Sequence, residues 1–339
     1  MKKTVKSILN IFISVVVLAL CVIYAMKDVD ISQLWEIIKS ANYVWVLAPV
    51  PVILASHWVR AMRWRRILKP FIKAKSVLNL FSSVMVGYAI NCISPRGGEF
   101  VRPFTFARRE KVSYSSVLGT IVVERFIDVV ALALMLAATF FFQSDKLILA
   151  LPAQIDTNKM IFMGVLVLAV LVLGFYPPAC RFLLKALLKP ISAKFYDKIM
   201  ELFEKFVVGF SIIKKPREYF MLIIESVTIW LLYTLPMYLM FFSFDFEATL
   251  HLGFADAIML CVVSGVITTI APTPGALGLY HLAIQSAMLT IYGIPADVGL
   301  AYATLTHGVN YLVQIAVGGA FFFRENVSMK NIPETAEEN

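Results

Sequence analysis

The sequence predicts an all-α integral membrane protein, a polytopic helical bundle with two hairpins that are broken by proline and glycine or re-enter the membrane. Hydrophobic residues make up 60% of the 339 residues, and the mean hydropathy is +0.79. Several apolar runs reach the roughly 18 residues that span a bilayer as a helix. Charged residues are 16% of the chain and gather beside these runs. A soluble protein of this length would not have this composition.

The apolar runs are candidate membrane spans. They cover residues of about 8–26, 43–60, 76–93, 115–142, 160–177, 219–243, 255–272, 276–293 and 297–323. Loops rich in lysine and arginine should face the cytoplasm, because basic residues are enriched on that side of a membrane. The basic loops follow the second span, precede the fourth and precede the sixth, whereas the opposite loops hold four lysines against eight acids. We therefore expect a multi-pass protein of the plasma membrane with both termini cytoplasmic.

The same charge pattern requires residues 76–103 to enter the membrane and return. The loops on either side of this stretch are both basic, and after a helix at 76–93 only a short broken limb is left for the return. A second pair, 255–272 and 276–293, is joined by Ala271-Pro-Thr-Pro-Gly-Ala-Leu-Gly278, which holds no charge to mark a cytoplasmic loop. Two such breaks in the two halves are typical of transporter folds with internal repeats. No sequence repeat is visible, so internal repeats are a hypothesis.

The chain is expected to form one transmembrane domain over residues 1–323. Its first apolar run follows Lys2, Lys3 and Lys6 and is interpreted as a retained signal anchor. The segment 178–218 is basic, with apolar residues at helical spacing, which predicts an amphipathic helix pair on the anionic inner leaflet. Residues 324–339 are short and polar, and we expect a disordered cytoplasmic tail.

The first candidate site is the stretch Asn91–Pro103, where an apolar helix is interrupted. Lipid cannot satisfy a broken backbone or a bare charge, so such a segment must be buried in protein or line a wet cavity. Glycine N–H groups and arginine side chains suit a phosphate, which predicts a site for an anionic lipid headgroup. The candidate residues are Arg96, Gly97, Gly98, Glu99 and Arg102. The alternative is that Arg96 and Glu99 pair with each other or a neighbour, while Arg102 reaches the inner headgroups.

The second candidate site is the group Glu124, Arg125 and Asp128, inside a run that is otherwise uncharged. Glu124 and Asp128 share a helix face at i,i+4, and Arg125 reaches Asp128 at i,i+3. Ionisable groups at this depth are costly, so the three must face the protein interior. They either line a substrate pathway or form a structural ion-pair lock between helices.

The third candidate site is the break that contains Pro274, Gly275 and Gly278. A helix that restarts there would aim its N-terminal N–H groups into the bundle, where they favour an anion. His281 and His307 lie on neighbouring predicted spans and could approach each other, and a histidine pair can carry protons. The alternative is that each histidine is a hydrogen-bonded packing residue.

Other classes of function have little support in the sequence. The four cysteines and four histidines show no ligand spacing, and no phosphate loop, nucleophile elbow or metalloprotease motif is present. The net charge of +9 follows the positive-inside pattern, which argues against nucleic-acid binding. We expect no metal and no cofactor, membrane lipids as partners, and no pattern indicates an oligomeric state.

Four motifs, in this order and spacing, resemble the flippase-like transmembrane family related to the membrane portion of lysylphosphatidylglycerol synthase. They are Arg60-Ala-Met-Arg-Trp64, Asn91 to Pro103, Glu124-Arg125 with Asp128, and Pro274-Gly-Ala-Leu-Gly278. The resemblance covers about residues 8–323. It implies a domain that moves an anionic or glycosylated lipid between leaflets. In the synthase, aminoacyl transfer belongs to a separate soluble domain, which we do not expect in this chain, so a lysyltransferase activity is not expected.

The chain departs from the family pattern in several places. The spacing from Pro95 to Gly98-Glu99 is one residue shorter than the commoner one, and Ala276 stands where a second glycine is usual. His281 replaces a frequent glutamate, and the family often has an arginine near His307. If that glutamate and arginine normally pair, this chain has replaced both partners, which bears on ion coupling and on the substrate.

The expected function is that of a lipid translocase without catalytic chemistry, handling an anionic phospholipid or a glycosylated or polyprenyl lipid. The charged residues near the inner leaflet would line a cavity that the Pro274–Gly278 break closes from the other half. One alternative is a membrane enzyme acting on a lipid phosphate, with Glu99, Glu124 or Asp128 as acid or base, or an accessory of aminoacyl-lipid synthesis. Another is a regulatory partner subunit whose charges are only interhelical locks.

Overall fold

All regular structure in the described part of the chain is helical, in agreement with the predicted fold class. The computed structural model describes residues 14, 16–27, 29–70, 72, 74, 76–146, 177–190, 192–193, 196–197, 200, 203–204, 216–270 and 273–324. Two helical stretches, Tyr43–Leu68 and Pro216–Phe241, are long and apolar enough to cross a membrane. Val16–Ala25, Val77–Ile93 and Phe254–Thr269 are shorter apolar helices.

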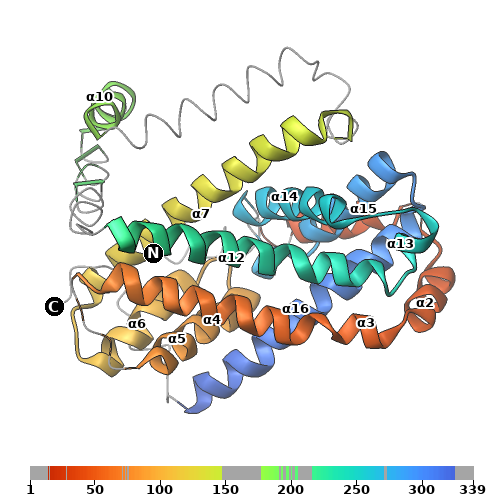
Figure 1. The fold of residues 1–339 in the computed structure, drawn as a ribbon, viewed down its shortest axis with the longest axis horizontal. Helices are drawn as coiled ribbons and strands as arrows, with labels where there is room; N and C mark the ends of the chain where they lie inside the picture. Colours follow the sequence, from red (N-terminus) through yellow and green to blue (C-terminus); the bar gives the residue numbers. More distant parts are fainter. Residues whose placement is uncertain are drawn as a thin grey trace.

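The helices other than α10 form one bundle with long members lying side by side, and α10 lies apart from them (Figure 1). Helix α4 packs along α12, and α16 packs along α5 and α15. The labelled helices are α2 (Ile31–Ser40), α3 (Tyr43–Leu47), α4 (Pro49–Leu68), α5 (Val77–Ile93), α6 (Gly98–Glu110), α7 (Tyr114–Phe142), α10 (Pro177–Leu188), α12 (Pro216–Phe241), α13 (Phe246–Thr249), α14 (Phe254–Ile270), α15 (Leu279–Tyr292) and α16 (Ala296–Arg324).

Helix boundaries follow local capping chemistry. Asp30 caps α2 by accepting the Ser32 N–H at 2.8 Å, and the side chains of Asn42 and Ser76 cap α3 and α5 in the same way. These side chains satisfy N–H groups that lack a partner within the helix. Helix α15 ends at Gly293 in the left-handed conformation, which glycine adopts without a steric cost.

Within the described residues, most predicted spans agree with a helix to within a few residues, but the second does not. Residues 8–13 and 15 of the first predicted span lie outside the described residues. The predicted helix over 43–60 continues to Leu68, because Arg60 and Arg63 are buried against acidic groups instead of lying in a basic loop. The span predicted at 160–177 lies outside the described residues, apart from the first residue of α10. Of the amphipathic segment 178–218, only α10, a few residues up to 204 and the first residues of α12 are described, and its place on the inner leaflet stays a prediction. The tail beyond Arg324 lies outside the described residues.

The first predicted hairpin is confirmed as α5 and α6, with the break at Ser94–Gly97. Its return limb is longer and more regular than expected, because α6 is helical from Gly98 to Glu110 and includes Pro103. The two limbs approach closely at two glycines. A Cβ atom added to Gly98 would lie 1.9 Å from the carbonyl oxygen of Gly87.

This contact makes Gly98 a sensitive position for folding. We expect Gly98→Ala to lower the free energy of unfolding by about 1–3 kcal/mol, the usual cost of overpacking a buried contact. The matched control is Gly119→Ala in α7, where an added Cβ meets nothing within 4 Å. That change should leave stability equal or raise it by up to about 1 kcal/mol through helix propensity. Thermal unfolding of both variants in detergent measures the difference, and equal midpoints would contradict the close approach.

The second predicted hairpin is also present, as α14 and α15 joined by an irregular segment with a short 3₁₀ turn at Pro274–Ala276. Gly275 and Gly278 have positive φ values of 55° and 80°, and Ala276 has a φ of 60°. Glycine adopts such values readily, whereas alanine does so at a steric cost. Residues 271–272, the first part of the predicted break, lie outside the described range.

Candidate functional site

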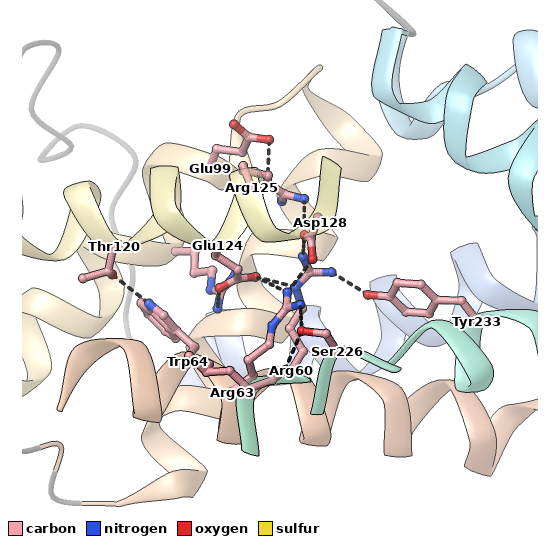
Figure 2. Close-up of polar contacts among 12 residues, drawn as sticks. Arg60, Arg63, Trp64, Glu99, Thr120, Glu124, Arg125, Asp128, Ser226 and Tyr233 are labelled. Carbon is pink, nitrogen blue, oxygen red and sulfur yellow. Dashed lines mark hydrogen bonds and ion pairs between the residues drawn. The ribbon is translucent and has the colours of Figure 1, made fainter. Parts of the chain in front are cut away.

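Glu124 in α7 is the centre of a buried ion-pair network (Figure 2). Its carboxylate accepts two hydrogen bonds from Arg102 of α6, at 2.9 and 2.8 Å, and one from Nε of Arg60 at 2.6 Å. Nη2 of Arg63 lies 3.9 Å from the same carboxylate. Glu124 is fully buried, so these arginines supply the stabilisation that water would otherwise give.

Asp128, one helical turn further along α7, extends this network. It accepts a hydrogen bond from Nη2 of Arg63 at 2.5 Å and another from Arg60. Nη1 of Arg125 lies 3.5 Å from Oδ2 of Asp128, as the i,i+3 spacing predicted. Arg60 also donates to the hydroxyl groups of Tyr88 and Tyr233. Helices α4, α6 and α7 are therefore joined through two carboxylates and their arginines, and Arg60 connects them to α5 and α12 through the two tyrosines.

Arg102 is not directed to the inner headgroups, and that alternative is wrong. The side chain is 4% exposed, and its guanidinium lies 4.0 Å from the ring centroid of Trp64. The indole N–H of Trp64 in turn donates to Thr120 of α7 at 2.9 Å. Arg102 is thus held on one side by Glu124 and on the other by an aromatic face. Arg102 is therefore part of a buried ion pair and does not line the cavity described below.

Arg96 and Glu99 do not pair with each other. Oε1 of Glu99 lies 3.2 Å from Nε of Arg125, so Glu99 pairs with a residue of α7. Arg96 donates to the backbone carbonyl of Thr269 in α14. Gly97 and Gly98 form the turn of the first hairpin, where the Gly98 N–H donates to the Asn91 side chain at 2.8 Å.

A cavity of about 570 Å³ lies between the two hairpins. Its charged lining residues are here called the charged wall, and its neutral ones the neutral wall. The charged wall contains Arg60, Arg96, Glu99, Arg125 and Asp128. The neutral wall includes Gly275, Tyr280, His307, Asn310, Tyr311 and Gln314. Segments that are far apart in the sequence, including both helix breaks, therefore enclose the same space.

The two breaks also contact each other directly. The hydroxyl group of Tyr311 in α16 donates to the carbonyl of Cys92, next to the first break, at 2.5 Å. A Cβ atom added to Gly275 of the second break would lie 2.7 Å from the Tyr311 ring and 3.5 Å from Cα of Cys92. The expected pairing of the two breaks around one cavity is therefore present in the fold.

The histidines of the third candidate site lie together, as their spans predicted. The ring centroids of His281 and His307 are 4.9 Å apart, and Nε2 of His307 lies 2.8 Å from the carbonyl oxygen of Gly275. His307 lines the cavity, whereas His281 is outside its lining. Gly278, where α15 restarts, lies against Leu18 and Cys21 of the N-terminal helix instead of the cavity. Pro274 likewise lies outside the cavity lining.

Two further acids, Glu225 and Asp256, are buried and paired away from this network. Glu225 is 7% exposed and is bound by Arg66 at 3.0 and 2.9 Å. Asp256 caps α14 by accepting the Gly253 N–H at 2.9 Å and also pairs with Lys146 at 2.5 Å.

Sequence reasoning missed Arg60 and Arg63 as members of the site. They were assigned to a cytoplasmic loop, yet their exposed fractions are 2% and 0%. One signal was available, because Arg60, Arg63 and Ile67 share a helix face at i,i+3 and i,i+7. A second signal was the excess of acid in α7, where Arg125 alone cannot balance two carboxylates. His57, one turn before Arg60, was also missed; both ring nitrogens are buried without a hydrogen-bond partner among the described residues.

Comparison with known proteins gives consistent matches over most of the chain. The family model described as lysylphosphatidylglycerol synthase TM region matches residues 11–318. The chain is 24% identical to glycosyltransferase AglD of Haloferax volcanii over 99% of its length, but spans only 57% of that protein. It is 21% identical to a UPF0104 membrane protein of Pyrococcus horikoshii, with 85% of this chain and 89% of that one covered. For a UPF0104 membrane protein of Methanocaldococcus jannaschii the identity is 25%, and the coverages are 88% and 90%.

Proposed function

Because the chain belongs to the lysylphosphatidylglycerol synthase TM region family of membrane proteins, we propose that it binds the anionic headgroup of a lipid and moves that lipid between leaflets. The observation that carries this proposal is the cavity between the two hairpins, with arginines on one wall. Its volume of about 570 Å³ lies within the roughly 300–1,000 Å³ that is usual for small-molecule sites.

The charge balance around the cavity favours an anion. The charged groups of its lining, together with the other members of the buried ion-pair network, are five arginines and three carboxylates, which leaves two positive charges in excess. The arginines are Arg60, Arg63, Arg96, Arg102 and Arg125, and the carboxylates are Glu99, Glu124 and Asp128. A phosphate group would supply the missing negative charge and accept paired hydrogen bonds from guanidinium groups.

The rim of the cavity would let a lipid enter by its headgroup. Val129, Thr268 and Thr269 line the cavity and are themselves exposed at the surface of the bundle. Arg125, whose side chain is 39% exposed, also lines the cavity, one helical turn before Val129. We place the headgroup against the arginines and the acyl chains outside the rim, in the surrounding lipid. This arrangement keeps the charged part of the lipid out of the hydrocarbon, where it would be costly.

Two lipid classes are the first to test. An anionic phospholipid provides the phosphate alone, and a glycosylated polyprenyl phosphate adds sugar hydroxyl groups. The second class is included because the relative AglD is named a glycosyltransferase, although this chain spans little more than half of it. Hydroxyl groups would meet amide and phenol side chains such as Asn310, Gln314 and Tyr311 on the neutral wall.

The test is leaflet exchange by the purified protein in vesicles. Fluorescent analogues of both lipids are reconstituted with and without the protein, and a membrane-impermeant quencher measures the label that reaches the outer leaflet. We expect Arg125→Gln to slow exchange about tenfold or more, because a hydrogen bond to a charged group contributes roughly 1.5–3 kcal/mol. The matched control is Arg65→Gln, which removes the same charge from an exposed position of α4 outside the cavity.

Two outcomes would contradict the proposal. Absence of exchange for all these lipids, with correctly folded protein in the vesicles, would exclude an autonomous translocase. Recovery of a chemically altered lipid from the same vesicles, lost in Glu99→Gln, would instead support a membrane enzyme that acts on a lipid phosphate.

A further inference from the structure

Arg96 has an unusual backbone conformation for its residue type. Its φ is +56°, in the left-handed region, where a residue with a Cβ atom is less stable by roughly 1–2 kcal/mol. A glycine at position 96 would adopt this conformation without that cost, and the next residue, Gly97, is a glycine. The turn itself does not use the arginine side chain. It is held by hydrogen bonds from Gly97 N to Ser94 O at 3.1 Å and from Gly98 N to the Asn91 side chain at 2.8 Å.

The Arg96 side chain instead contacts the other broken hairpin. Its Nη2 donates to the carbonyl oxygen of Thr269, in the last turn of α14. Carbonyl groups in the last turn of a helix have no partner within the helix and carry the negative end of its dipole. The Thr269 hydroxyl donates to the carbonyl oxygen of Gly265 at 2.7 Å, so it does not compete with Arg96 for the Thr269 carbonyl. Arg96 therefore caps α14 from the first hairpin.

Arg96 differs from the other two arginines that line the cavity. Arg60 and Arg125 each have carboxylate partners: Arg60 lies 2.6 Å from Glu124, and Arg125 lies 3.2 Å from Glu99. Arg96 has no ion pair with any described residue, and its side chain donates to one neutral carbonyl. Hydrogen bonds between ionised partners are about twice as strong as those between neutral groups, and a phosphate can accept two from one guanidinium. An anion in the cavity would therefore outcompete the Thr269 carbonyl.

We propose that Arg96 couples headgroup binding to the movement of α14. When an anionic headgroup enters, the guanidinium exchanges the Thr269 carbonyl for the headgroup, and the end of α14 loses its cap. The first hairpin then keeps its neutral contacts to the rest of the bundle, such as the hydrogen bond from Tyr311 of α16 to the Cys92 carbonyl at 2.5 Å. If the hairpins separate where Arg96 contacted Thr269, the headgroup can leave the cavity by a different route. This inference rests on the proposed function, since it requires the cavity to take an anion.

The test is hydrogen–deuterium exchange of the full-length protein in nanodiscs of phosphatidylcholine. The readout is backbone exchange at residues 266–270, the end of α14. Adding phosphatidylglycerol to the nanodisc is expected to speed this exchange about fivefold, the ratio that corresponds to loss of one hydrogen bond of about 1 kcal/mol. Arg96→Gln should show the faster exchange in phosphatidylcholine alone and no further response. Arg65→Gln should behave as the unmodified protein does.

A third arm separates a lipid headgroup from a free anion. Inorganic phosphate is added to phosphatidylcholine nanodiscs in place of phosphatidylglycerol. A response to phosphate that matches or exceeds the lipid response would overturn the assignment to a lipid headgroup. A second variant, Arg96→Gly, relieves the strained backbone and removes the side chain. It should raise the thermal midpoint while speeding exchange at the end of α14, a combination that a purely stabilising contact would not give.

Native mass spectrometry of the same samples distinguishes failure of the coupling from failure of the proposed lipid site. If phosphatidylglycerol binds and exchange at the end of α14 does not change, the coupling is overturned and the lipid site stands. If no anionic lipid binds and only Arg96→Gln alters exchange, Arg96 is a fixed cap, and both the coupling and the anionic-lipid site are overturned.

Discussion

Glu124→Gln is expected to destabilise the bundle by about 3–5 kcal/mol, the cost of leaving buried charges without their partner. The carboxylate binds Arg102 and Arg60 at 2.8 and 2.6 Å, and all three side chains are 5% exposed or less. An amide offers one acceptor oxygen and no charge, so the buried positive charges of Arg102 and Arg60 would no longer be balanced by this side chain. Chemical or thermal unfolding in detergent measures the loss, as a lower midpoint at unchanged helix content in the folded baseline.

The control for Glu124→Gln is Glu36→Gln. Glu36 pairs with Lys39 at 2.9 Å on α2, but both side chains are more than half exposed. Exposed ion pairs contribute about 0–1 kcal/mol, so this change should have little effect. Equal midpoints for Glu124→Gln and the unmodified protein would show that the network does not hold the helices together.

A double variant tests whether the network is a lock with matched charges. Arg102→Met removes one of the guanidinium groups and keeps an apolar side chain against Trp64. Combined with Glu124→Gln, it should cost less than the sum of the single changes, because each single change leaves the other charge buried and unpaired. Additive costs would mean that Arg102 and Glu124 do not depend on each other.

The sequence was sufficient to predict features that depend on local spacing. The interruption at Pro95–Gly98 predicted the first hairpin, and i,i+3 spacing predicted the contact between Arg125 and Asp128. Hydropathy predicted an all-helical bundle, and adjacent spans predicted that His281 and His307 lie together. Each of these follows from helix geometry over a few turns or from neighbouring elements, both of which a single sequence contains.

The sequence was not sufficient to predict which distant helices meet. Arg60 and Glu124 are 64 positions apart, and nothing local to α4 shows that its arginines have buried partners. The positive-inside rule counts basic residues and does not distinguish a loop arginine from one in the last turns of a longer helix. The burial of Arg102 could not be predicted for the same reason, because it depends on Trp64 of α4 and Glu124 of α7. Long-range pairing therefore decides which arginines remain available to a ligand.

Exchanging the charges of Arg125 and Asp128 is expected to abolish folding instead of restoring a lock. Asp128 is bound by Arg63 at 2.5 Å and by Arg60, whereas Arg125 lies 3.5 Å away. Arg125→Asp with Asp128→Arg would place a new guanidinium against those of Arg60 and Arg63, which would also have lost the carboxylate of Asp128. A loss of at least about 3–5 kcal/mol is expected from the unpaired charges alone, a large share of the roughly 5–15 kcal/mol that stabilises a typical protein.

The matched exchange is Glu36→Lys with Lys39→Glu, an exposed i,i+3 pair on α2. It should leave folding unchanged, because solvent screens both arrangements. The yield of monodisperse protein in size-exclusion chromatography and its thermal midpoint measure both variants. If the Arg125 and Asp128 exchange folds and moves lipid normally, the two residues form a self-contained lock, as a regulatory subunit would require. If the Arg125 and Asp128 exchange does not fold while the α2 exchange does, Asp128 balances the charges of Arg60 and Arg63. Arg125 then keeps a cavity-facing guanidinium that can bind a headgroup.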